Sequence, residues 1–397
     1  MQTDSDQWTG ASHMYELDPG DGEISQCLAH WDAPPNGVGD SRAFRSAKWS
    51  PDGTLVATLS EDNALRVYDA DAAVQRYATG TGDVPEITAP CATVTHGETV
   101  LDYAWFPHTG RQGPLCLAES VRDHPVHLRD TGDGTARATY RAVDSTDAPM
   151  TAAALAFAPD ARALFCGYAG HIARFDVYRP GLPVQLAQTS PARRSRDGMK
   201  GIVACVAPMD APQHAPMAGL LACASLQNHV ALYSRNSLDS CVALWTVSRE
   251  YAGSGVTALQ WARAGTVVWA ASRRSAYIVG WDVRDLRGPW AVLQRPVAAT
   301  NQRMAIDVDG SGRHLVAGQV DGSVSVYDTD ASSGSVAFAA HGDAVPALAM
   351  HPFYPLLASA SGQRHFAEPD APDDCSLRIW SLDARYLPHA SSSLINT

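Results

Sequence analysis

The sequence predicts an all-β protein folded as a seven-bladed β-propeller that an N-terminal strand closes. Three observations predict this fold. A unit of short apolar strands separated by turns recurs seven times in the 397 residues. Successive copies lie about 52 residues apart on average, the length of a four-stranded blade of ~40–45 residues plus longer loops. A further alternating segment precedes the first copy and supplies the strand that the last copy lacks.

Each copy begins with a small apolar strand, a Pro/Asp/Gly turn and a second apolar strand. A third strand follows, which ends in an aromatic residue and often Asp. The clearest copies begin at Phe44 ("FRSAKWSPDGTLVATLSEDNALRVYDAD"), Met150 and Gln302, and Trp281-Asp282 is a WD dipeptide. This pattern is typical of WD-type blades. We expect the third strands to end near Tyr68, Leu128, Phe175, Tyr233, Trp281, Tyr327 and Trp380.

The last copy shows only three clear strands. The segment from Glu23 to Asp32 ("EISQCLAHWD") alternates apolar and polar residues. We expect it to form the fourth strand of the last blade, since this would cover an open sheet edge. The expected organisation is a disordered lead over 1–22, a propeller over 23–386 and a polar tail over 387–397.

Composition limits the function. The formal net charge of -12 excludes a globally basic nucleic-acid binder, although a local basic patch can still attract phosphate. The eight cysteines include no CxxC pair, and several lie in apolar runs. The cysteines in these runs are expected to behave as small hydrophobes, and the chain is expected to lie in a reducing compartment without a disulfide framework. No apolar run approaches a membrane span, so no membrane association is expected.

Catalytic signatures are absent from the sequence, including nucleotide-binding loops, HExxH and GxSxG. We therefore expect neither an enzyme nor a metal, cofactor or small-molecule substrate. His96 and His341 precede the first strands of two repeats, and we expect each to hydrogen-bond a buried Ser or Thr.

Polar residues sort onto two faces because the strands of a blade are antiparallel. Loops between second and third strands, and connectors between blades, share one face, which we call the arginine face. Arginine pairs bidentately with phosphate and stacks on bases, so this face is a candidate RNA site. A protein partner and a solvated loop face stay open as alternatives. Its candidate residues are Arg122, Arg193, Arg194, Arg273, Arg274, Asn301, Gln302, Arg303, Gln363 and Arg364.

Two stretches in the last repeats resemble the telomerase Cajal body protein family of WD-repeat proteins. They are "TNQRMAIDVDGSGRHLVAGQVDGSVSVYDTD", from Thr300, and "HPFYPLLASASGQRHFAEPD", from His351. The resemblance extends roughly from Phe44 to Leu382 and is that of a fungal-type member. Its most distinctive parts are the tetrads Thr300–Arg303 and Ser361–Arg364. The long low-complexity N-terminal region of animal members is not in this sequence.

The resemblance implies a nuclear RNA-binding scaffold, in Cajal bodies or the nucleoplasm. Such a scaffold recognises a loop element of small Cajal-body RNAs of the box H/ACA type, telomerase RNA among them. It assists their localisation and their assembly with ribonucleoprotein core proteins. The alternative function is a protein-only WD-repeat scaffold, for example a splicing-associated one.

The two tetrads belong to neighbouring blades. Our hypothesis is that Arg303 and Arg364 help to build one RNA-contacting patch, in which Gln302 and Gln363 hydrogen-bond base edges or the 2′-hydroxyl. The rival hypothesis is structural, because the same side chains could brace the blade junctions and cap carbonyls.

Overall fold

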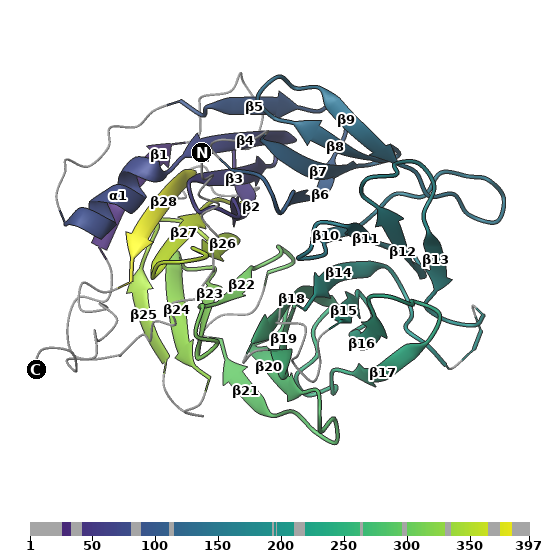
Figure 1. The fold of residues 1–397 in the computed structure, drawn as a ribbon. Helices are drawn as coiled ribbons and strands as arrows, with labels where there is room; N and C mark the ends of the chain where they lie inside the picture. The colour runs from purple at the N-terminus through teal and green to yellow at the C-terminus, as the bar shows by residue number, and fades with distance from the viewer. Residues whose placement is uncertain are drawn as a thin grey trace, which may run out of the picture.

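Seven four-stranded sheets form a ring in a computed structural model of the chain (Figure 1). The structure describes residues 26–32, 42–80, 89–110, 115–192, 194–195, 197–209, 219–262, 265–295, 300–329, 335–363 and 374–382. Each sheet is one blade with antiparallel neighbours, which confirms the predicted all-β propeller. The expected lead over 1–22 and tail over 387–397 lie outside the described residues.

The first four blades follow in chain order. Blade 1 contains β2 (Phe44–Trp49), β3 (Leu55–Ser60), β4 (Ala64–Asp69) and β5 (Ala92–Thr95). Blade 2 contains β6 (Val100–Trp105), β7 (Cys116–Val121), β8 (Val126–Asp130) and β9 (Ala136–Tyr140). Blade 3 contains β10 (Ala154–Phe157), β11 (Ala163–Tyr168), β12 (His171–Asp176) and β13 (Gln185–Gln188). Blade 4 contains β14 (Val203–Pro208), β15 (Leu220–Ser225), β16 (His229–Ser234) and β17 (Cys241–Thr246).

The remaining blades complete the ring. Blade 5 contains β18 (Val256–Ala262), β19 (Val267–Ser272), β20 (Tyr277–Asp282) and β21 (Ala291–Gln294). Blade 6 contains β22 (Ile306–Val308), β23 (His314–Gly318), β24 (Ser323–Asp328) and β25 (Ser335–Ala339). Blade 7 contains β26 (Ala347–Met350), β27 (Leu356–Ala360), β28 (Ser376–Ser381) and β1 (Gln26–Asp32). All seven predicted aromatic or apolar ends fall within third strands.

The N-terminal strand closes the ring, as predicted. β1 pairs antiparallel with β28, with Trp31 opposite Leu377 and His30 opposite Arg378. Its described part begins at Gln26, within the segment expected from Glu23. Both ends of the propeller are thereby held in a single sheet, which covers the outer edge of β28.

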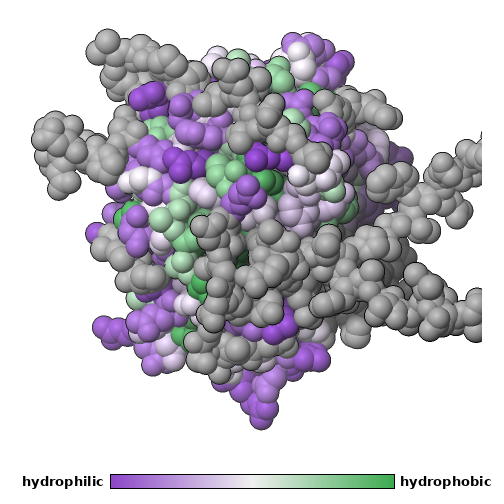
Figure 2. Space-filling view, turned by 90° about the vertical axis from the view of Figure 1, so that its left-hand side faces the viewer, coloured by the Kyte–Doolittle hydropathy of each residue, from purple (hydrophilic) through white to green (hydrophobic). Residues whose placement is uncertain are grey.

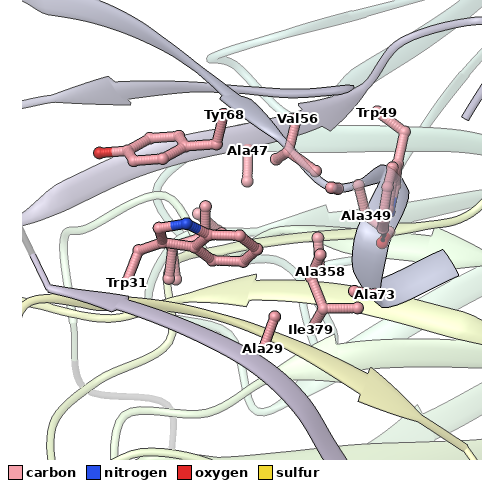
Figure 3. Close-up of a cluster of buried hydrophobic side chains, with 14 of the residues drawn as sticks. Ala29, Trp31, Ala47, Trp49, Val56, Tyr68, Ala73, Ala349, Ala358 and Ile379 are labelled. Atoms are coloured by element: carbon pink, nitrogen blue, oxygen red, sulfur yellow. Dashed lines mark hydrogen bonds between the residues drawn. The ribbon is translucent and has the colours of Figure 1, made fainter. Parts of the chain in front are cut away.

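A buried cluster fixes this closing blade to blade 1 (Figure 3). The ring of Trp31 lies 5.9 Å from that of Tyr68, measured between centroids. The indole nitrogen of Trp49 donates a hydrogen bond of 3.0 Å to the carbonyl oxygen of Ala349, in blade 7. Small residues such as Ala47 and Ala358 let the two sheets approach closely.

One helix interrupts the strands and was not predicted. α1 (Asp71–Thr79) lies between β4 and β5 and packs beside β1 (Figure 1). Its ends follow ordinary rules: Asp71 lies in the first turn, and Gly80 closes the helix in the left-handed conformation at φ 66°. An isolated helix of nine residues has only marginal stability in water, so α1 depends on its packing against the rest of the protein. Ala73 is buried, and Tyr77 packs on the cluster of Figure 3.

The two blade histidines differ in their partners. His341 Nε2 lies 2.7 Å from the hydroxyl of Ser359, which confirms the expected hydrogen bond to a buried serine. His96 does not contact Ser or Thr as predicted; its Nε2 lies 3.1 Å from a carboxylate oxygen of Glu119. Glu119 is fully buried, and it also accepts a 2.7 Å hydrogen bond from Arg129 Nε. A buried carboxylate that also pairs with Arg129 therefore lies where a neutral Ser or Thr partner was expected.

The surface and the thiols are consistent with an ordinary folded domain. In the coloured part of the flank that carries α1 and β25, hydrophilic residues surround smaller apolar patches (Figure 2). All eight cysteines are free. Burial raises the pKa of Cys166 and Cys223 well above the usual thiol value, so these two are inert. Among the described residues, no helix is long and apolar enough to cross a membrane.

Candidate functional site

The centre of the ring contains a cavity of about 470 Å³. The first strands of six blades, β2, β6, β10, β14, β18 and β22, contribute residues to its wall. These strands lie nearest the centre of the ring in Figure 1. The connector Asn301–Arg303 enters it from the arginine face, immediately before β22. Its charged and amide lining residues are Arg45, Lys48, Glu61, Asp102, Gln260, Asn301, Gln302 and Arg303.

The cations of this channel differ in their pairing. Arg45 donates to the carbonyl oxygen of Val100 at 3.0 Å and lies 3.5 Å from Glu61. Lys48 Nζ lies 2.9 Å from a carboxylate oxygen of Asp102. The exposed Arg303, in contrast, makes no hydrogen bond or ion pair with any described residue.

The positive charge of Arg303 affects the pKa of a cysteine in the channel wall. Burial raises the pKa of Cys205 to about 12, and the positive charge of Arg303 opposes this rise. Cys205 lies on β14, on the channel wall. Arg303 is therefore a cation at the channel that remains available to an external anion.

The two glutamines of the tetrads are used within the protein. Gln302 Nε2 donates a 2.9 Å hydrogen bond to the carbonyl oxygen of Gly362. Gln363 Nε2 donates to the carboxylate of Asp343 at 2.8 Å, and its backbone N–H donates to the same carboxylate at 3.2 Å. These contacts agree with the bracing hypothesis, and RNA recognition by the glutamines stays a prediction.

Position 362 requires glycine for steric reasons. Its φ of 132° is a conformation that side chains rarely adopt, and an added Cβ would lie 2.6 Å from the Cα of Ala43. Ala43 leads into β2 of blade 1, so blade 7 approaches its neighbour at this glycine. The serine-glycine pair of the second tetrad thus has a structural role at the ring closure.

The arginines of blade 5 lie beside the connector. Arg273 and Arg274 form the turn between β19 and β20, and the backbone N–H of Arg274 donates to the carbonyl oxygen of Thr300 at 3.2 Å. Arg273 Nη2 donates to the carbonyl oxygen of Ser254 at 3.2 Å. Both arginines and Gln302 line a second, small cavity between blades 5 and 6. The structure therefore brings two predicted segments together.

The other predicted arginines are not joined to this group. Arg122, in the turn between β7 and β8, and Arg194, between β13 and β14, are exposed and line neither of the two cavities. Arg193 and Arg364 lie outside the described residues. The predicted patch of Arg303 with Arg364 stays a prediction.

Two basic residues in these cavities were missed by the sequence analysis, Lys48 and Arg295. Lys48 lies on the channel side of β2. Strand alternation alone does not predict that a lysine of this strand lines a cavity. Arg295 is only 5% exposed and directly follows β21. Its position corresponds to that of His96 and His341 at blade starts, which is the signal that could have found it. Among the described residues, no group of three or more metal-ligating side chains occurs.

Comparisons with known proteins agree with this architecture. The family model "WD domain, G-beta repeat" matches residues 26–69. Telomerase Cajal body protein 1 of Homo sapiens is 32% identical over 339 residues, 83% of this chain and 59% of that protein. The chain is a seven-bladed β-propeller similar to telomerase Cajal body protein 1. The Drosophila melanogaster homologue of that protein is 30% identical over 338 residues, 82% of this chain and 58% of the homologue.

A relative of another name also matches. Guanine nucleotide-binding protein negative regulator 1 of Schizosaccharomyces pombe is 28% identical over 290 residues, which are 71% of this chain and 69% of that protein. The chain spans about 60% of the length of the telomerase Cajal body protein 1 relatives that it matches.

Proposed function

We propose that the protein is a non-enzymatic, nuclear WD-repeat scaffold that binds small RNA of the Cajal-body, box H/ACA type. It assists the localisation of that RNA and its assembly with ribonucleoprotein core proteins. Telomerase RNA is included among the candidate ligands, and the fungal-type affiliation stays part of the proposal. The similarity to telomerase Cajal body protein 1 over four fifths of the chain supports this class of RNA.

The observation that carries the RNA proposal is the unpaired guanidinium of Arg303 at the channel. On the same face, the hydrogen bond from Arg274 to Thr300 fixes a second exposed arginine beside the connector. Neither side chain makes a hydrogen bond or ion pair with a described residue. Cations that no protein carboxylate neutralises can replace the counterions of a nucleic-acid backbone, even on a protein with a net charge of -12.

The exposed Asn301 adds an uncharged polar side chain beside these two arginines. Its side-chain amide has donors and an acceptor for a base edge or a ribose hydroxyl. The cations Arg45 and Lys48, on β2 in the channel wall, are paired with carboxylates, which disfavours entry of an RNA strand into the channel. Binding is therefore proposed on the rim of the arginine face.

The test is crosslinking of RNA to the protein in cells, followed by sequencing. Wild type is compared with the double variant Arg303→Ala/Arg364→Ala, after thermal unfolding shows that the variant folds. Enrichment of box H/ACA-type RNA that collapses in the double variant supports both the function and the patch. Enrichment that survives retains the function but removes these arginines from it. No specific RNA in wild type contradicts the proposal.

A protein-only scaffold, for example a splicing-associated one, is the second candidate. A specific observation favours it: large apolar side chains are exposed at the outer parts of blades 3 and 4. Tyr178, Leu182 and Val184 are each at least 60% exposed, and Val242 on β17 is 59% exposed. Exposed apolar groups of this kind often contact proteins. Affinity purification with the variant Leu182→Ser/Val184→Ser would show whether a protein partner depends on this surface.

A further inference from the structure

One arginine in the structure is buried without a partner. Arg295 is 5% exposed, and its Nε and Nη2 atoms have no hydrogen-bond partner among the described residues. Burial lowers the pKa of this guanidinium to about 10, which leaves it charged at neutral pH. Burying a charge without a counter-charge costs folding free energy. An anion from outside the chain would offset this cost at Arg295.

Five blades share the position that Arg295 occupies; two of them place Thr189 and Val247 there, and the other three place Arg295, His341 and His96. Arg295 follows β21, and its backbone N–H donates to the carbonyl oxygen of Ala276 at 2.7 Å. His341 and His96 follow β25 and β5, and they donate in the same way to Gly322 and Asn63, ahead of the third strand. All three side chains are thus placed to reach into the next blade.

The next blade places a hydroxyl or a carboxylate beside each of the two histidines but neither beside the arginine. His341 reaches the hydroxyl of Ser359 on β27, and His96 reaches the carboxylate of Glu119 on β7. In blade 7, Leu357 on β27 pairs with Trp380 on β28, and Ser359 lies two residues after Leu357. In blade 6, Leu315 pairs with Tyr327, and the residue two positions after Leu315 is Ala317. Alanine has no side-chain acceptor for Arg295.

A small cavity lies beside Arg295, between blades 5 and 6 on the arginine face. Its volume is about 10 Å³, the room that one water or one oxygen atom occupies. Its polar and charged lining residues are Ser272, Arg273, Arg274, Ser275, Arg295, Thr300, Gln302 and Gln319. Arg273 Nε is a further buried donor without a partner. The lining thus offers three guanidinium groups and no carboxylate.

The backbone of Arg274 gives independent support. Arg274 has a φ of 57°, the left-handed region that disfavours most side chains. The corresponding turns of five other blades place Gly, Asn or Asp in that conformation: Asn63, Asp123, Gly170, Asn228 and Gly322. An arginine in this disfavoured conformation, beside a buried arginine without a partner, supports a role for its charge at this junction.

We propose that this cavity is a subsite for one oxygen of an RNA backbone phosphate, held by Arg295 from within and by Arg273 and Arg274 beside it. The inference rests on the proposed function and names the part of the RNA bound at this junction. The cavity admits one oxygen, so the rest of the phosphodiester lies outside it, next to the connector Asn301–Arg303. The several N–H groups of neighbouring guanidiniums suit the spread charge of a phosphate.

The test compares wild type with Arg295→Met, which keeps an unbranched, apolar stem and removes the guanidinium and its charge. RNA affinity is measured with a labelled hairpin RNA that has a randomised loop, and thermal unfolding is measured with and without inorganic phosphate. We expect Arg295→Met to bind RNA about 10-fold more weakly and yet to unfold at a higher temperature, because an unpaired buried charge is gone. Phosphate should raise the unfolding temperature of wild type only.

Two controls keep the result specific. Arg287→Ala removes an exposed arginine, paired with Asp285 in the loop between β20 and β21, and should change neither readout. Arg274→Asn should also weaken RNA binding while relieving backbone strain, which covers the case that Arg295→Met fails to fold. The same RNA with uncharged methylphosphonate linkages in its loop should bind wild type and Arg295→Met almost equally.

The outcomes separate this inference from the proposed function. If wild type binds the hairpin RNA and both Arg295→Met and Arg274→Asn bind it equally well, the cavity holds water only and the inference is wrong, while the RNA function stands. If wild type binds no RNA but phosphate stabilises it through Arg295, the RNA assignment fails and the site belongs to free phosphate.

Discussion

The side-chain amide of Gln302 donates a 2.9 Å hydrogen bond to the carbonyl oxygen of Gly362, which joins the connector into blade 6 to blade 7. Both residues belong to the tetrads that most distinguish the sequence. Within the first tetrad the neighbouring residue Arg303 has the opposite character, since it is exposed and makes no hydrogen bond with a described residue. The tetrad therefore combines a structural brace with an available cation.

The brace makes a prediction about stability. Gln302→Ala removes the hydrogen bond to Gly362 and leaves a partly buried carbonyl oxygen without this donor. We expect the free energy of unfolding to fall by about 1 kcal/mol, as measured by urea denaturation. Asn301→Ala is the matched control, because Asn301 is exposed and makes no such contact, and its stability should equal that of wild type. Equal stabilities of Gln302→Ala and wild type would refute the bracing role.

Closure of the ring through β1 makes a second prediction. Trp31 is 3% exposed and contacts Tyr68 across the boundary of blades 7 and 1 (Figure 3). Trp31→Ala should lower the free energy of unfolding by about 3–5 kcal/mol through lost burial and a cavity. Gln26→Ala, at the exposed start of the same strand, should have almost no effect. A small loss for Trp31→Ala would mean that β1 contributes little to closure.

The buried carboxyl of Asp307 predicts a pH dependence. It accepts hydrogen bonds of 2.8 Å from the backbone N–H groups of Val308 and Met350, and so joins β22 to β26. Burial raises its pKa to about 6, against the effect of those hydrogen bonds. An unfolded Asp has a pKa of about 4, so the folded state binds this proton more tightly. Its contribution to stability is therefore largest below pH ~4 and is lost as the pH rises to ~6.

Asp307→Asn removes this titration. Relative to wild type, its free energy of unfolding should rise between pH 4 and pH 7, by up to about 3 kcal/mol. Urea denaturation of both proteins at several pH values measures this difference. At lower pH, protonation of Asp374 should destabilise both proteins equally. Burial alone would raise the Asp374 pKa, but hydrogen bonds from His341, Ser376 and Gly342 lower it overall. A difference that stays constant from pH 4 to pH 7 would show that Asp307 does not titrate in this range.

Most of the fold could be predicted because each blade repeats a strand pattern with strong turn residues. Asp52, for example, accepts hydrogen bonds from Ser50 and Thr54 in the turn where its type was expected. The helix α1 could not be predicted in this way. It is short, it lacks a side-chain N-cap, and it is stabilised by packing against a cluster to which distant β1 contributes. Such long-range packing leaves little trace in the local sequence.

The candidate site was predictable only in part. Strand alternation correctly groups Arg273, Arg274 and Asn301–Arg303 on one face, because loop position follows from strand direction. It cannot show that Gln302 turns toward Gly362 or that Arg295 is buried without a partner, since both depend on side-chain packing between blades. The difference between an occupied and an available polar group is a property of three-dimensional contacts.

The most direct test of the account is the salt dependence of RNA binding, measured by titration of labelled RNA at several salt concentrations. We compare wild type, Arg303→Ala and the control Arg287→Ala on the opposite face. The account predicts that wild-type affinity falls steeply with salt. Arg303→Ala should reduce the slope of log K against log salt by about 0.7, the value for one lost phosphate contact to single-stranded RNA. Wild-type binding that is absent, or a slope that Arg303→Ala leaves unchanged, would contradict the central claim that this face binds RNA through Arg303.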